Sequence, residues 1–189
     1  IRHFPSTDAL ARAKTSEVLT LWQGLGYNRR ALNLHRAAQE IVKKYGCTFP
    51  TEYSALLALP GVGKATAGDI LAFAYNKPAV VIETNIRTVF IHHFFTHKEN
   101  ISDKEIEKQI EKTLDTDHPR KWYYALMDYG SHLKKTMGNN IHQSKHYKKQ
   151  SPFKGSKRQK NAARLKRALA RGAGEAALIK LLSHPKRKK

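Results

Sequence analysis

The sequence predicts an all-α fold, and three observations support this expectation. Apolar residues recur at helical spacing through most of the 189 residues, and only residues 78–82 form a short extended apolar run. A proline and two glycines mark a tight turn between two short helical segments within residues 52–75. The last third is strongly basic and also helical in pattern. A chain of this length can bury the core of one medium domain or two small ones.

The expected helices follow one another along the chain with short connections. Ser16 or Thr15 can cap a first helix that runs to about Trp22, and a glycine-containing turn follows. The next helix carries an apolar stripe and ends at Gly46. The helices expected after the first cover residues 28–45, 52–59, 64–75, 85–95, 103–114, 119–137, 158–171 and 174–182.

The most informative segment is residues 59–68, with the sequence LPGVGKATAG. Pro60 sets a turn, while Gly61 and Gly63 permit a close approach of the backbone. The second helix opens after Gly63, so its first N–H groups lack intrahelical partners and can bind a phosphate. The spacing of a nucleotide-binding phosphate loop is absent. A turn with a purely structural role is the alternative. The residues expected to contact a DNA backbone are Gly61, Val62, Gly63, Lys64 and Thr66.

The positive charge is concentrated near the end of the chain. The net charge is +20 and the isoelectric point is near 10.1. Residues 1–133 contribute only +3, whereas residues 134–189 contribute +17. So few acids among so many bases favour contact with a polyanion over a merely solvated tail. We expect a helical body over residues 1–137, a linker over 138–156 and a basic helical tail over 157–189.

Within this basic region, Lys154, Lys157 and Arg158 are the expected phosphate contacts. The affinity for DNA should therefore depend steeply on salt concentration. Deletion after about residue 150 should weaken that dependence.

Several classes of protein are disfavoured by the composition. The single cysteine, Cys47, excludes an internal disulfide and a multi-cysteine metal site. His142 and His146 stand at helical spacing, but a solvated pair explains them better than a metal site does. No apolar run approaches the length of a membrane span, and no secretory signal is visible. We expect a cytoplasmic, nucleoid-associated protein. Because Ile1 lies inside a turn-then-helix pattern, we also expect that the chain is truncated at its N-terminus.

Glu83 is the strongest candidate for a chemical role. It follows an apolar segment and stands at the start of an expected helix, where the helix dipole favours a carboxylate. An acid that only stabilises the helix N-terminus would produce the same local pattern.

With these residues in place, the sequence resembles the helix-hairpin-helix DNA glycosylases, and among them the MutY-type adenine DNA glycosylases most closely. The resemblance implies base excision repair, in which a flipped base is released by hydrolysis of its N-glycosidic bond. Its expected partner is double-stranded DNA with adenine opposite guanine or 8-oxoguanine, and the expected state is a monomer. The motifs that carry it are residues 21–27 (LWQGLGY), 33–38 (NLHRAA), 59–68, 82–89 (IETNIRTV) and 125–130 (ALMDYG).

The same resemblance assigns roles to particular residues. Glu83 stands where the family has a catalytic Asp, and Asn85 is expected to position that carboxylate or the attacking water. Asp128 and Tyr27 are expected at the base pocket, although a surface acid and a core aromatic are their plain alternatives. The family's second catalytic carboxylate, a Glu that acts as general acid, is expected N-terminal to Ile1.

Two departures from the family bear on chemistry. Lys134, Ile141, Ser144 and Gln150 stand at about the positions of four iron–sulfur cluster cysteines, so we expect no cluster, no metal and no other cofactor. Ala65 stands where lyase relatives have a nucleophilic lysine, and a monofunctional glycosylase is therefore expected.

Two other functions stay open at this point. One is a related mismatch glycosylase that acts on thymine. The other is a non-catalytic or degenerate helix-hairpin-helix module that binds DNA.

Overall fold

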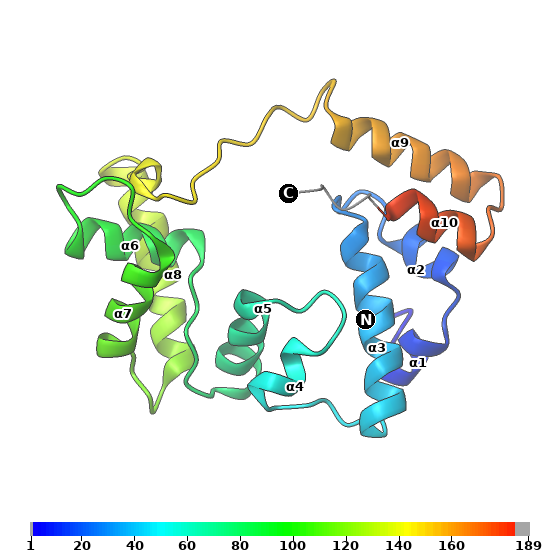
Figure 1. Cartoon of the computed structure of the whole chain (residues 1–189), viewed down its shortest axis with the longest axis horizontal. Helices are drawn as coiled ribbons and strands as arrows, with labels where there is room; N and C mark the ends of the chain where they lie inside the picture. The colour runs from blue at the N-terminus through cyan, green and yellow to red at the C-terminus, as the bar shows by residue number, and fades with distance from the viewer. Residues whose placement is uncertain (1, 184–189) are drawn as a thin grey trace. The chain divides into compact units, whose positions relative to one another are not determined.

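The computed structural model describes residues 2–183, and within that range it is helical with no β-strand (Figure 1). Ile101 and Ser144 form an isolated parallel bridge. The all-α prediction is confirmed. In chain order the elements are α1 (Thr7–Arg12), α2 (Thr15–Leu21), α3 (Arg29–Tyr45), α4 (Tyr53–Leu57), α5 (Lys64–Asp69), the π-helical turn η1 (Ile70–Ala74), α6 (Thr84–Phe94), α7 (Asp103–Thr113), α8 (Pro119–Thr136), the 3₁₀ turn η2 (Ile141–Gln143), α9 (Lys157–Ala170) and α10 (Glu175–Leu182).

The described chain forms two compact units. The first unit holds residues 2–50, 58–61 and 150–183, and the second holds residues 51–57 and 62–149. By contacts, α9 and α10 are therefore grouped with the N-terminal helices. The predicted body, linker and tail are consecutive stretches of sequence, whereas the two units are grouped by contacts. The predicted division therefore stays a prediction.

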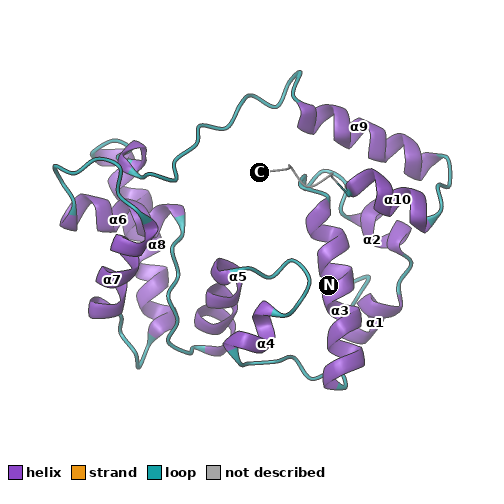
Figure 2. Ribbon diagram, in the orientation of Figure 1, coloured by secondary structure: helices purple, strands orange, loops and turns teal. Residues whose placement is uncertain are grey.

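The core of the first unit includes both C-terminal helices. Leu165 of α9 and Leu178 of α10 are buried together with Val18, Leu19 and Ala31. Burial of a leucine side chain stabilises a fold by about 1.5–3 kcal/mol. Figure 2 shows α9 and α10 as two regular helices joined by a short loop. The basic tail is thus amphipathic, and its apolar face belongs to a core.

The second unit is built on the packing of α6 against α8. Ile86 and Phe90 of α6 are buried with Ile110 of α7 and Tyr123 of α8. Gly130 of α8 is buried at the helix contact, where a Cβ atom would lie 2.2 Å from the backbone oxygen of Asn85. A glycine is therefore required here by the close approach of α8 to the start of α6.

The predicted hairpin forms with altered helix lengths. Its first helix is shorter than expected, because α4 covers Tyr53–Leu57, and its second helix is α5 continued by η1. Gly61 has φ +80°, and a Cβ there would lie 2.5 Å from the Cβ of Asn33, so both conformation and space demand glycine. Gly63 differs, since its φ of −100° is open to any residue and nothing lies within 4 Å of its Cβ position.

Of the helices in residues 2–183, none has the length and apolar character needed to cross a bilayer.

Candidate active site

The segment before Glu83 is held in place by two neighbouring helices. The hydroxyl of Tyr123 on α8 accepts a hydrogen bond from the N–H of Val81 (3.0 Å) and donates one to the carbonyl of Ala79 (2.6 Å). On the other side, Gly68 of α5 lies so close that a Cβ would be 2.4 Å from the carbonyl oxygen of Val80. This extended segment therefore delivers Glu83 at a defined position.

Glu83 is the N-cap residue of α6, as its sequence context predicts. Its side chain is exposed, and Oε2 accepts a hydrogen bond of 2.7 Å from the N–H of Thr84. Unpaired N–H groups at a helix N-terminus interact favourably with negative charge. The carboxylate is thus anchored by the backbone while it stays open to solvent.

Asn85 lies two residues further on and is fixed by α8. Lys134 Nζ donates a hydrogen bond of 2.6 Å to Asn85 Oδ1. A lysine ammonium can only donate, so the carbonyl end of the amide faces Lys134 and the NH₂ end points elsewhere. Gly130 supports the same residue through its close approach to the Asn85 backbone. Asn85 is therefore oriented through its backbone and through its side chain.

Two charged residues to which the sequence interpretation gave no role beside Glu83, Asp69 and Lys134, lie within electrostatic reach of it. Burial raises the pKa of Asp69, at the end of α5, and the negative charge of Glu83 raises it further. Burial lowers the pKa of Lys134, while the charge of Glu83 opposes that shift. The sequence signal for Asp69 is an acid set among Ala67, Gly68 and Leu71, which are all small or apolar.

The pKa of the Tyr123 phenol is shifted as well. Burial raises its pKa to about 12, the hydrogen bond from Val81 opposes the rise, and Asp69 adds to it. The phenol therefore remains a hydrogen-bond donor throughout the neutral pH range.

The two predicted base-pocket residues belong to different units. Asp128 is an exposed residue of α8 in the second unit. Tyr27 belongs to the first unit, is 59 % exposed and has φ +47°, so it is not the core aromatic of the alternative interpretation. Its hydroxyl accepts a hydrogen bond from Gln150 Nε2, and the guanidinium of Arg30 lies 5.7 Å from its ring centre.

The predicted phosphate-binding residues are open to solvent to different degrees. Lys64 and Thr66 at the start of α5 are exposed, as are Lys154 and Lys157. Arg158 is half-buried, because its guanidinium lies 5.9 Å from the ring centre of Phe153 and donates a hydrogen bond to the Ser151 carbonyl.

The four positions expected to replace cluster cysteines make ordinary protein contacts. Lys134 binds Asn85, Gln150 binds Tyr27, and Ile141 and Ser144 are buried, the latter beside Ile101. None of these side chains offers a thiolate, so they do not fit an iron–sulfur cluster. In residues 2–183, no group of three or more His, Cys, Asp or Glu side chains is arranged to hold a metal ion.

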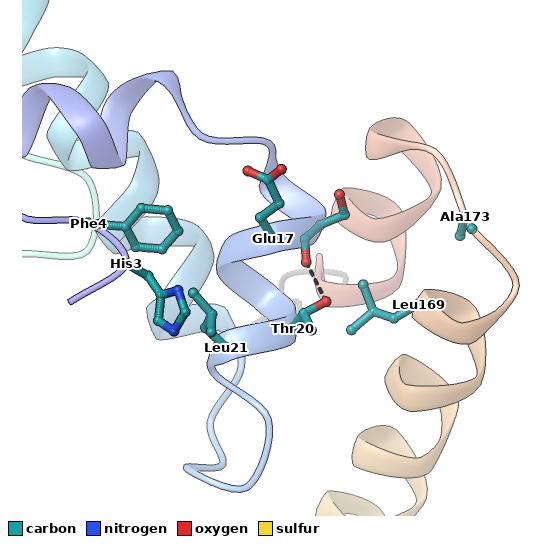
Figure 3. A pocket seen from close by; sticks show the side chains of 9 residues that line it. His3, Phe4, Glu17, Thr20, Leu21, Leu169 and Ala173 are labelled. Carbon is teal, nitrogen blue, oxygen red and sulfur yellow. Dashed lines mark hydrogen bonds between the residues drawn. The ribbon is translucent and has the colours of Figure 1, made fainter. Parts of the chain in front are cut away.

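A separate pocket of about 620 Å³ lies in the first unit (Figure 3). Figure 3 shows Phe4, His3 and Leu21 on one side and Leu169 with Ala173 on the other. None of the predicted site residues lines it.

Together, the helical hairpin and the anchored carboxylate at the start of α6 define a helix-hairpin-helix protein of the DNA glycosylase type. The family model described as "HhH-GPD superfamily base excision DNA repair protein" matches residues 1–116. The chain belongs to that family. The match ends before α8, so Asp128, Gly130 and Lys134 lie outside it.

The chain is similar to several adenine DNA glycosylases. It is 37 % identical over 135 residues to that of Buchnera aphidicola subsp. Baizongia pistaciae (strain Bp), covering 69 % of this chain and 38 % of the relative. The adenine DNA glycosylase of Mycobacterium tuberculosis (strain H37Rv) is 40 % identical over 89 residues, which cover 47 % of this chain and 29 % of the relative. The chain thus spans about two fifths or less of the length of these relatives.

Solved structures share the fold. A thermostable thymine-DNA glycosylase has a TM-score of 0.58 at 23 % identity, with 69 % of this chain and 61 % of that chain covered. A non-covalent endonuclease III–DNA complex has a TM-score of 0.63 at 20 % identity, with 74 % and 65 % covered. The predicted helix-hairpin-helix glycosylase fold is confirmed.

Proposed function

We propose that this chain belongs to a DNA glycosylase that hydrolyses the N-glycosidic bond of adenine mispaired with guanine or 8-oxoguanine. The observation that carries the proposal is the exposed Glu83 carboxylate, anchored at the N-terminus of α6 beside an oriented Asn85. Family membership supports base excision repair, and the relatives named adenine DNA glycosylase support adenine as the base.

The chemistry asked of Glu83 is electrostatic. As the bond between adenine and C1′ breaks, the sugar acquires positive charge, and a carboxylate near C1′ stabilises it. The NH₂ end of Asn85 can hold the carboxylate or the attacking water, because its carbonyl end is bound to Lys134. The departing adenine needs a proton from an acid. The resemblance assigns that role to a Glu N-terminal to Ile1, and this assignment stays a prediction.

DNA contact in this proposal comes from two regions of the chain. The exposed start of α5 supplies backbone N–H groups with Lys64 and Thr66, and the basic region supplies Lys154 and Lys157. We propose a monomer that acts on double-stranded DNA at the nucleoid. It uses no metal or cluster, and it leaves the strand intact because Ala65 stands where lyase relatives have the nucleophilic lysine, while the adjacent Lys64 points about 100° away on the helix.

A single-turnover assay of the protein at its natural length tests the proposal. Duplexes carry adenine opposite 8-oxoguanine or thymine opposite guanine. Glu83→Gln should slow adenine release by about 10²-fold or more, since it removes the charge that stabilises the transition state. Glu107→Gln, which alters an exposed acid of α7, is the matched control. Unchanged turnover in Glu83→Gln would remove this residue from the mechanism.

The same assay separates the alternative functions. A thymine mismatch glycosylase, favoured by the structural likeness to a thymine-DNA glycosylase, would release thymine opposite guanine faster than adenine. A non-catalytic DNA-binding module is favoured by the hydrogen bond from the N–H of Thr84 to Glu83, because an acid that only stabilises the helix N-terminus would make the same contact. That module would bind both duplexes and release neither base.

A further inference from the structure

We propose that Lys134 is a positioning residue for the glycosylase reaction, because its ammonium group holds the Asn85 amide in one orientation beside Glu83. This inference rests on the proposed function, since it assigns Asn85 to the reacting site. The contact itself is a property of the fold and can be tested without activity.

The contact between Lys134 and Asn85 is short and charged. The distance of 2.6 Å from Nζ to Oδ1 is that of a strong hydrogen bond with an ionised donor. Lys134 is half-buried, so its side chain is confined within the packing of α8 rather than free in solvent. An Asn amide without such a partner can turn over and exchange its donor and acceptor ends.

The position of Lys134 on α8 explains why it reaches Asn85. Gly130 and Lys134 are four residues apart and share one face of the helix. The missing side chain at Gly130 brings α8 against the Asn85 backbone, and one turn later Lys134 extends to the Asn85 side chain. Tyr123, further back on α8, holds the segment that precedes Glu83. One helix therefore supports both candidate catalytic residues.

The charged side chains around this contact have identifiable partners. Glu83 interacts electrostatically with two charged groups. These are Asp69 on α5 and Lys134 on α8. The other cation near the start of α6, Arg87, is held by Asp103 of α7 in a bidentate pair. Of these two cations, Lys134 is the one with an electrostatic interaction with Glu83. Burial lowers the pKa of Lys134, and the carboxylate of Glu83 opposes part of that shift.

The contact also assigns a role to Lys134, which is one of the departures from the family that the sequence resembles. The resemblance places a cluster cysteine at about this position, and this chain instead has a side chain that hydrogen-bonds to Asn85. A thiolate bound to a cluster could not donate this hydrogen bond, whereas an ammonium group can.

The test combines a spectroscopic readout with kinetics. Three variants are compared: Lys134→Met removes both charge and donor, Lys134→Gln keeps a donor without the charge, and Lys134→Arg keeps both. Lys135→Met alters the neighbouring exposed lysine of α8 and is the control. In the full 189-residue chain, the side-chain amide ¹H–¹⁵N signals of Asn85 should move in Lys134→Met and stay in place in Lys135→Met.

In the protein at its natural length, Lys134→Met should lower the single-turnover rate by about 10- to 100-fold, because misplacement of a positioning group has effects of this size. The dissociation constant for DNA should stay within about 2-fold, and Lys134→Arg should recover most of the rate. If Lys134→Met does not fold, Lys134→Leu, which also removes both the charge and the donor, takes its place in both measurements.

Two results would overturn the proposal. One is an Asn85 amide signal that does not respond to the loss of Lys134, and the other is a changed signal with an unchanged rate. A wild-type protein that releases no base from any duplex would instead refute the proposed function, while the Asn85 signal would still report on the contact.

Discussion

Gly130 offers the sharpest test of how the candidate site is built. A Cβ atom at this position would lie 2.2 Å from the Asn85 oxygen, 2.7 Å from its carbonyl carbon and 3.0 Å from its Cα. Ordinary van der Waals contact begins at about 3.4 Å, so α8 and the start of α6 must separate by roughly 1 Å in Gly130→Ala. These neighbours are backbone atoms, which cannot rotate out of the way.

The expected cost follows from two opposing effects. In a helix interior, replacing Gly by Ala normally stabilises a protein by up to about 1 kcal/mol. Overpacking of a tight contact costs about 1–3 kcal/mol. We therefore expect a net loss of up to about 2 kcal/mol in the free energy of unfolding. A displacement of about 1 Å beside Asn85 should also slow base release by about 10²-fold.

Urea denaturation and single-turnover kinetics measure the two effects. Ser131→Ala, at the next position of α8, removes an oxygen and adds no atom, so it serves as the control for helix propensity. A Gly130→Ala protein that is more stable than the wild type and equally fast would show that α8 does not press on Asn85 as described.

Three further predictions concern the ionisation of Asp69, the phosphate contacts of the basic region and the absence of a lyase amine. Because the folded state raises the pKa of Asp69, the stability from this group is present below its unfolded value of 3.8 and is lost as the pH rises through the folded value. In urea titrations, Asp69→Asn should therefore gain stability relative to the wild type as the pH rises above 3.8, and a constant difference would contradict the assignment. Combined Lys154→Gln and Lys157→Gln should reduce the slope of log affinity against log salt by about 2, whereas an unchanged slope would exclude both phosphate contacts. These substitutions replace a deletion after residue 150, which would remove Leu165 and Leu178 from the core. Borohydride should trap no covalent adduct with substrate DNA, and an adduct that disappears in Lys134→Met would reveal a lyase amine on α8.

The local features of the fold could be predicted from the sequence. Gly46 ends α3 with φ +54°, and Glu83 caps α6, because both assignments depend on a few adjacent residues. The hairpin turn at Gly61 was predicted for the same reason. Its helix lengths were not, since α4 ends at Leu57.

The partners of the candidate site could not be predicted in this way. Lys134 is 49 residues from Asn85 along the chain, and their contact exists because α8 packs on α6. Asp69 gains its altered pKa from burial, which a local pattern does not reveal. Likewise, the charge pattern of the last third predicted a basic tail, while the role of Leu165 in a core depends on α2 and α3 folding against it.

The anchoring of α9 by Leu165 has a consequence for the entropy of binding. A disordered basic tail must be ordered when it meets a polyanion, at a cost of about 1–2 kcal/mol for each residue whose backbone is fixed. The cations of α9 are instead displayed on a helix that is already folded into its unit, at a regular rise of about 1.5 Å per residue. Most of that ordering is completed when the protein folds. The favourable free energy of the charge contacts is therefore reduced less by ordering when the polyanion binds.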